Sequence, residues 1–334
     1  MSTDGYYVLG GHQRDDKKRP SWHLYDHAVI LCVHPETGRV ERKVKYVTPP
    51  EARPDDENAA VCFKAGTVVG NRLFVPTSTE VVFYSLPDFE QVGYLSHPWF
   101  NDVHHVAVRP DGALVVVSTG LDMVVVMTEQ GDVIDAYSVN EDPLWSRFSP
   151  DTDYRKVLST KPHKSHPNYA FFVGDDLWAT RAWQRDALCL TDRSQPNLEI
   201  LVNYVHDGVV HGGRVYFTTV DGNIVVFDCS TREMVRRVDL NAISGKDGPL
   251  GWCRGLTVLD GERVVVGFTK VRKTKFREKV AWLKRFANPE VEIYPNPARI
   301  AAYDLANGKM LWEVDVEAHD MHAIFGIHTV GVAG

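Results

Sequence analysis

Short runs of apolar residues, separated by turns rich in Gly, Asp, Asn and Pro, follow one another along almost the whole chain. The runs are rich in Val, Ile, Phe, Tyr and Thr, a composition typical of β-strands. They recur as one unit: an apolar strand, a turn containing Gly, a Val-rich strand, a polar turn and two further strands. The unit is clearest at residues 103–137 and 206–240, and further copies begin near residues 62, 168 and 253. Such a repeat indicates stacked four-stranded sheets.

The pattern therefore predicts an all-β fold, a single β-propeller of six blades, with five or seven blades as alternatives. A lone strand at 322–330 ends the chain, and the strands that it lacks stand at 6–11, 27–33 and 39–47. We expect these N-terminal strands to join the C-terminal strand, which closes the ring and removes exposed sheet edges. A pair of β-sandwiches is a rival architecture, but it does not explain the repeat.

We expect one domain over residues 1–334, interrupted by insertions at about 140–167 and 270–297. The second insertion contains the one convincing amphipathic helix, at 276–288, with an apolar stripe. Residues 270–285 carry eight basic side chains against one acid, Glu278. This basic segment is a candidate lid over an anionic ligand, contact for an acidic partner, or helix at a membrane surface.

The chain has 14 histidines, and many of them stand at the start of a repeat. The first strand of each propeller blade lines the central channel, so side chains at that position converge on the axis. Neutral imidazole is the commonest nitrogen ligand of Zn, Fe, Cu and Ni. We therefore predict a metal site at the channel mouth, formed by His105, His166, His206 and His322. Which of His104 and His105, and which of His163 and His166, points into the channel stays open. A metal-free polar pocket is the alternative.

Three further residues are candidates for catalytic roles beside these histidines. Asp102 and Asp207 each stand close to a predicted ligand, where a carboxylate can hold the second ring nitrogen. Arg254 begins a blade, and its guanidinium suits a carboxylate or phosphate group. An anionic substrate is therefore compatible with the site.

The repeat resembles that of bacterial six-bladed propellers of the NHL and gluconolactonase type over nearly the whole chain. The resemblance implies the fold and not lactonase activity, because those lactonases use carboxylate and amide ligands where this chain has histidines. One histidine in each of four blades (His105, His166, His206 and His322) resembles the carotenoid cleavage oxygenases, whose seven-bladed propeller holds iron through four histidines. The arrangement is also similar to oligogalacturonate lyase, whose propeller binds a metal through histidines. Function is not inherited from fold alone.

Composition narrows the functional classes. The net charge of −7 and the absence of a known nucleic-acid-binding module disfavour nucleic acid as a partner. Five scattered cysteines, a polar N-terminus without a signal-peptide pattern and strand-sized apolar runs predict a cytoplasmic protein without a membrane span. We predict an enzyme that uses a divalent metal, iron(II) favoured and zinc or manganese as alternatives, on a small organic substrate. It would be an oxygenase, and so an oxidoreductase, or a lyase or isomerase. The alternative is a non-catalytic propeller that binds a small molecule or a protein.

Overall fold

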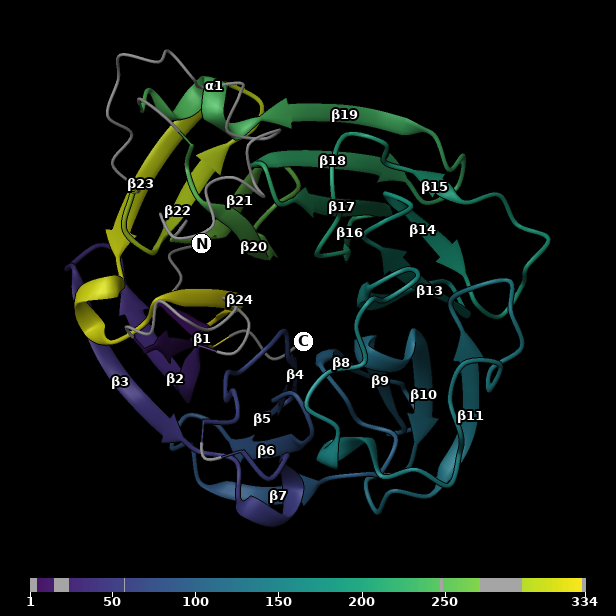
Figure 1. Cartoon of the computed structure of the whole chain (residues 1–334). Helices are drawn as coiled ribbons and strands as arrows, with labels where there is room; N and C mark the ends of the chain where they lie inside the picture. The colour runs from purple at the N-terminus through teal and green to yellow at the C-terminus, as the bar shows by residue number, and fades with distance from the viewer. Residues whose placement is uncertain (1–4, 15–23, 57, 247–248, 271–295, 332–334) are drawn as a thin grey trace, which may run out of the picture.

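Six four-stranded antiparallel sheets stand in a ring around a central hub (Figure 1). The computed structural model describes residues 5–14, 24–56, 58–246, 249–270 and 296–331. Within each sheet one strand lies at the hub and the others follow outward to the rim. The predicted all-β propeller with six blades is confirmed.

Five of the blades are built from consecutive strands. The first two of these contain β4 (Thr67–Val69), β5 (Arg72–Pro76), β6 (Val81–Ser85) and β7 (Gln91–Leu95), and then β8 (Val103–Val108), β9 (Leu114–Ser118), β10 (Met123–Met127) and β11 (Val133–Ser138). The next contains β12 (Pro167–Val173), β13 (Asp176–Arg181), β14 (Asp186–Cys189) and β15 (Leu198–Glu199). The last two contain β16 (Val209–His211), β17 (Arg214–Thr219), β18 (Asn223–Asp228) and β19 (Met234–Asp239), and then β20 (Trp252–Val258), β21 (Arg263–Thr269), β22 (Arg299–Asp304) and β23 (Lys309–Asp315).

The sixth blade joins the two ends of the chain, as predicted. Its order is β24 (Ala323–Thr329), β1 (Tyr6–Gln13), β2 (Tyr25–His34) and β3 (Arg39–Tyr46). The β24–β1 pairing brings the backbones unusually close at Gly10, where a Cβ atom would lie 1.8 Å from the carbonyl oxygen of Ala323. Glycine is therefore required at this point of the closing pair.

The apolar core is divided into layers between adjacent blades. Strands in the middle of a sheet, such as β9 and β10, are buried along their whole length because a neighbouring blade covers each face. Strands at the rim alternate instead, as in β23, where exposed residues take every second position. Each pair of adjacent blades shares one cluster of buried side chains, so the layers run around the complete ring.

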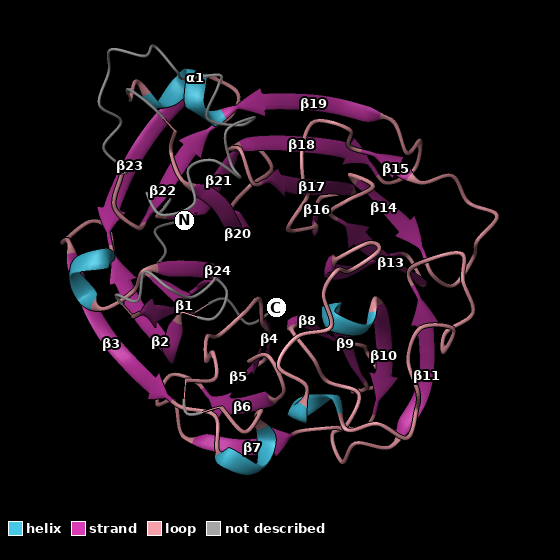
Figure 2. Cartoon of the chain, in the orientation of Figure 1, coloured by secondary structure: helices cyan, strands magenta, loops and turns pink. Residues whose placement is uncertain are grey.

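Helical structure is scarce among the described residues (Figure 2). It consists of one short α-helix, α1 (Leu240–Ser244), and four 3-10 turns at Pro50–Ala52, Thr119–Leu121, Tyr154–Lys156 and Glu317–His319. The amphipathic helix predicted at 276–288, and most of the basic segment around it, lie outside the described residues. None of the helices in the described part of the chain has the length and apolarity needed to cross a membrane.

Candidate functional site

A cavity of about 830 Å³ lies at the hub, and all six blades contribute to its wall. Its size suits a small organic molecule. One side of the wall carries histidines and a carboxylate, from β8, from the segment before β12 and from the segment before β16. The wall also carries the basic residues Lys64 and Arg254 and the ring of Phe325.

The first insertion brings two of the histidines to the hub. Its last residues, Lys164 to His166, wrap around the buried carboxylate of Asp122, which accepts hydrogen bonds from the backbone N–H groups of Lys164 (2.7 Å), Ser165 (3.1 Å) and His166 (2.9 Å). Arg147 Nη1 lies 2.7 Å from the same carboxylate. These bonds hold His166 at φ 55°, in the left-handed region that a residue with a side chain seldom adopts. Strain of this kind is common where a side chain must be aimed.

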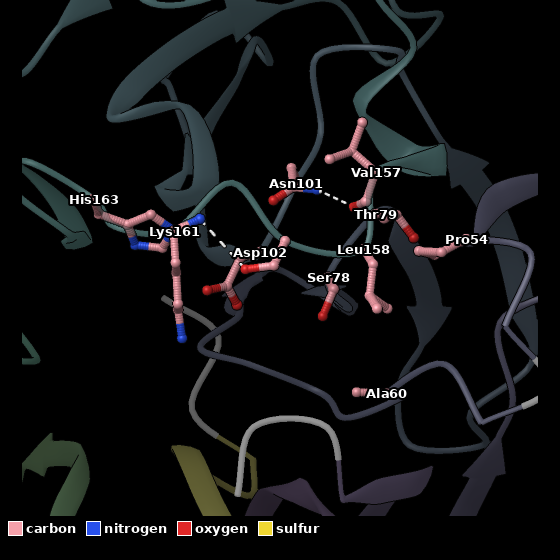
Figure 3. Close-up of a pocket in the computed structure, with 11 residues that line it drawn as sticks. Pro54, Ala60, Ser78, Thr79, Asn101, Asp102, Val157, Leu158, Lys161 and His163 are labelled. Carbon is pink, nitrogen blue, oxygen red and sulfur yellow. Dashed lines mark hydrogen bonds between the residues drawn. The ribbon is translucent and has the colours of Figure 1, made fainter. Parts of the chain in front are cut away.

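The preceding residue, Asn101, fixes the position of Asp102. Asn101 is buried, and its side-chain nitrogen donates to the carbonyl oxygens of Tyr154 (2.9 Å) and Val157 (2.8 Å) in the insertion. Asp102 itself has φ 47°. Figure 3 shows the Asp102 carboxylate beside His163 and Lys161, on the wall of a second pocket of about 60 Å³. The same three residues line the central cavity, so this group separates the two spaces.

Asp102, His163 and His166 form a group that could hold a metal ion. One ligand atom from each residue lies within 4.8 Å of the other two. The Nδ1 atoms of His163 and His166 share a hydrogen bond of 2.7 Å, so one of the two rings carries a proton on this nitrogen. Burial lowers the pKa of His163, and burial followed by the charge of His104 lowers the pKa of His166 well below its usual range. Both imidazoles are therefore neutral at physiological pH, the form that binds a metal.

His104 stands beside this group with a fixed tautomer. Asn168 donates from Nδ2 to the carbonyl oxygen of Val205 (2.8 Å), so its Oδ1 faces His104 Nδ1 at 2.6 Å and accepts the proton of that nitrogen. Burial lowers the pKa of His104 to about 3. Its Nε2 lies within hydrogen-bond distance, 3.2 Å, of Asp102 Oδ1.

His206 approaches the cavity from the next blade. It is 1% exposed, and Nε2 has no hydrogen-bond partner among the described residues. Its Nδ1 lies 3.4 Å from Asp207, whose carboxylate is fixed by Thr218 Oγ1 and by the backbone N–H of Gly255 (3.0 Å). Burial lowers the pKa of His206. A buried nitrogen without a partner, next to His104 at a ring distance of 6.0 Å, is available to a ligand in the cavity.

Lys64 and Arg254 both lie over the ring of Phe325, which is itself 5.9 Å from the His206 ring and 6.3 Å from the His104 ring. Lys64 Nζ lies 4.1 Å, and Arg254 Cζ 4.8 Å, from the centre of the Phe325 ring. Burial lowers the pKa of Lys64, and Asp102 opposes this shift from 3.9 Å. Arg254 Nε is buried without a hydrogen-bond partner in the described part of the chain. The two cations provide a place for an anionic group.

The structure does not bring the four predicted ligands together. His166 and His206 line the cavity, whereas His105 and His322 do not. The His105 ring stacks on Tyr169 at 3.6 Å, and its Nδ1 accepts from the backbone N–H of Ala170 at 3.2 Å. His104 takes the inward position because the β8–β9 register shifts between Val103 and His105, which leaves His104 as the bulged residue.

His322 lies in the closing blade, where its Nδ1 accepts from the backbone N–H of Gln13 at 3.2 Å. Phe325 lines the cavity from β24 instead. The predicted catalytic candidates Asp102 and Arg254 line the cavity, and Asp207 lies behind His206. Lys64 was not predicted; its position two residues after Cys62, at a blade start, was the available signal.

The known proteins that resemble this chain share its fold. Neither a family model nor a curated protein matches the chain. A protein of unknown function from Bacteroides caccae has a similar structure, with a TM-score of 0.61, 11% identity, and 97% of this chain and 98% of that chain covered.

Two further structures are less similar. The catalytically inactive virginiamycin B lyase from Staphylococcus aureus, with quinupristin, has a TM-score of 0.46 and 14% identity over 71% of this chain and 73% of that one. The C-terminal WD40 domain of Sif2 has a TM-score of 0.49 and 10% identity over 93% of this chain and 83% of that one. These comparisons do not show the expected resemblance to NHL, gluconolactonase or carotenoid oxygenase propellers. What they do show is the likeness of the β-propeller fold.

Proposed function

We propose that this protein is an enzyme that binds a divalent metal through Asp102, His163 and His166 and acts on an organic anion in the central cavity. The observation that supports it most directly is the convergence of these three ligand atoms within 4.8 Å on the wall of a cavity of about 830 Å³. Two histidines and one carboxylate leave coordination positions open for a substrate. Iron(II) is favoured by this ligand set, with zinc and manganese as alternatives.

The substrate would enter with its anionic group toward Arg254. The guanidinium can form paired hydrogen bonds with a carboxylate, and its buried Nε is unpartnered among the described residues. Aromatic side chains on the cavity wall, including Trp183 and Trp252, suit an apolar body. We therefore propose a small carboxylate with an apolar or aromatic body as the substrate class.

Lys64 favours a lyase or isomerase reaction. A buried lysine whose pKa is lowered gives up its proton more readily than an exposed lysine, and its amine can then act as a general base. Its Nζ lies 3.9 Å from Asp102, next to the proposed metal. The metal would polarise the oxygen of a carbonyl or carboxylate group of the substrate. Lys64 would then remove a proton from the carbon atom next to that group. In a lyase reaction the substrate would then expel a leaving group from the neighbouring carbon. In an isomerase reaction the proton would return to a different carbon of the same molecule.

An oxygenase is the second candidate, since two histidines and one carboxylate also form the ligand set of non-haem iron(II) oxygenases. The two can be separated with a panel of aromatic carboxylates and the iron-loaded protein. An oxygenase consumes O2 and adds oxygen to the product mass, whereas a lyase or isomerase works equally well without O2. Turnover of no compound together with retained binding would favour the non-catalytic alternative.

Metal analysis of protein purified without a histidine tag tests the site itself. Replacing both histidines, His163→Ala and His166→Ala, should remove about one equivalent of bound metal. His211→Ala, at the end of β16 away from the cavity, is the matched control and should remove none. Equal metal content in the three proteins, with unchanged circular dichroism, would overturn the proposal.

A further inference from the structure

A second group of histidines and aspartates lies outside the cavity, in the blade that closes the ring. It consists of His12 at the end of β1, Asp26 and His27 at the start of β2, and Asp320 in the turn before β24. We call these four residues the closure group. His12, His27 and Asp320 offer ligand atoms within 4.8 Å of one another.

One carboxylate lies beside the Nδ1 atoms of both rings in the closure group. His12 Nδ1 donates to Asp26 Oδ1 at 2.7 Å, and His27 Nδ1 lies 2.8 Å from the same oxygen. The carboxylate that holds the outer nitrogen of a metal-binding histidine acts in this way in many metal sites.

The opposite nitrogens of the two rings face a second carboxylate. His12 Nε2 lies 3.5 Å, and His27 Nε2 2.9 Å, from Asp320 oxygens. The Nε2 atoms of both rings therefore lie beside the same carboxylate, and one cation could be held among these three ligand groups.

The two rings are stacked. They are nearly parallel, 11° apart, with centres separated by 4.7 Å, so both can present Nε2 to one ion beside Asp320. The Arg42 guanidinium lies 3.2 Å from the same carboxylate and holds it in place. A single metal ion at this position would accept all three ligands.

We propose that the closure group binds Zn²⁺ through His12 Nε2, His27 Nε2 and Asp320. Tetrahedral zinc with bonds of 2.0–2.1 Å places its ligand atoms about 3.3 Å apart. The distances to the Asp320 carboxylate, 2.9 Å from His27 Nε2 to Oδ2 and 3.5 Å from His12 Nε2 to Oδ1, are close to that value. A partly exposed group, with His12 at 26% and Asp320 at 32% exposure, leaves the fourth position to solvent or to His322, whose ring lies 4.6 Å from that of His12.

Zinc at this position would cross-link the N-terminal and C-terminal strands that close the ring. Its ligands come from β1, from β2 and from the turn before β24, and His27 and Asp320 are 293 residues apart in the chain. A ligand that binds only the folded state stabilises it by mass action. At a free zinc concentration of 100 times the Kd, the folded form should gain about 100-fold over the unfolded form.

The experiment uses the full chain carrying His163→Ala and His166→Ala, so that the cavity group cannot contribute. After chelator treatment, ZnCl2 is titrated by calorimetry and the Tm is measured with and without zinc. We expect one equivalent to bind and the Tm to rise. His12→Gln and Asp320→Asn should each abolish both effects, and His211→Ala in the same background should leave both unchanged.

Asp26→Asn provides a second readout. It keeps the shape of the side chain but replaces the charged acceptor behind the ligands, and it should weaken zinc binding by about 10- to 100-fold without changing the stoichiometry. Failure of zinc to bind the background protein, or binding that His12→Gln and Asp320→Asn leave intact, would overturn the closure site. Neither result bears on the cavity metal, because its two histidine ligands are replaced in the protein used.

Discussion

His104 Nδ1 lies 2.6 Å from Asn168 Oδ1, and this one contact determines which nitrogen of His104 faces the cavity. The two residues come from neighbouring blades, β8 and β12. Asn168→Leu would leave a buried N–H of His104 without an acceptor. We expect the free energy of unfolding to fall by about 1–3 kcal/mol, measured by urea denaturation.

The same variant should weaken metal binding in the cavity, because the His104 ring would be free to present either nitrogen. Asn203→Leu, on the segment before β16, is a control with the same change of side chain. A stability loss no larger than that of the control would contradict the assigned role of Asn168.

Asp122 determines the position of the histidine segment. Asp122→Asn replaces one acceptor oxygen with a nitrogen that cannot accept from the backbone N–H groups around it, and it leaves Arg147 without its carboxylate. We expect a loss of about 3–5 kcal/mol in unfolding free energy and a loss of cavity metal. Asp142→Asn is the control, since its carboxylate pairs with the exposed side chain of Lys164 in the same insertion. Retained metal in Asp122→Asn would show that the segment is positioned by other contacts.

Lys64→Met should separate metal binding from catalysis. Removing a positive charge 3.9 Å from Asp102 lowers the repulsion that a bound cation meets, so metal affinity should rise several-fold. Catalysis should fall by about 100-fold or more, because the proposed base is gone. Calorimetry with the metal alone and turnover of an identified substrate measure the two effects. Lys309→Met, on an exposed rim residue, should change neither. Weaker metal binding in Lys64→Met would indicate that the amine supports the site.

Acid should destabilise the protein partly through His328, which lies in β24 away from the cavity metal group. Burial lowers its pKa from 6.5 to about 4. The unfolded chain therefore binds a proton more readily, so this contribution to stability is complete above pH 6.5 and is lost as the pH falls toward 4. Between pH 7.5 and pH 4.5 the loss amounts to about 2–3 kcal/mol. His328→Leu should reduce the difference in unfolding free energy between these two pH values by that amount, and an unchanged difference would contradict the assignment.

The fold could be predicted because the same pattern of strands and turns recurs in each blade. Each blade carries the same alternation of Val-rich strand and polar turn, so the inner strands β8, β12, β16, β20 and β24 begin close to the expected residues. The lone strand at the end of the chain and the unpartnered strands at its start indicated the ring closure, which the β24–β1 pairing confirms.

The site could be predicted only in part, because side-chain direction depends on local backbone irregularities. Because of one bulge in β8, His104 lines the cavity and His105 does not. His163 reaches the group through the wrapping of its segment around Asp122, a contact between residues 42 to 44 positions apart. His322 meets β1 rather than the axis. None of these arrangements has a signature in the spacing of residues along the chain.

The closing blade also constrains how the protein is made. During synthesis β1 leaves the ribosome before β24. The other five blades can therefore pair their strands while β1 still lacks β24, its neighbour in the closing blade. Until then β1 presents an open edge of backbone donors and acceptors to other nascent chains. The final pairing, which brings Gln13 against His322, can form only after the 309 residues that separate them have been synthesised. Truncation near the C-terminus is therefore expected to be far more damaging than its length suggests, since it removes the one strand that turns an open array of blades into a ring.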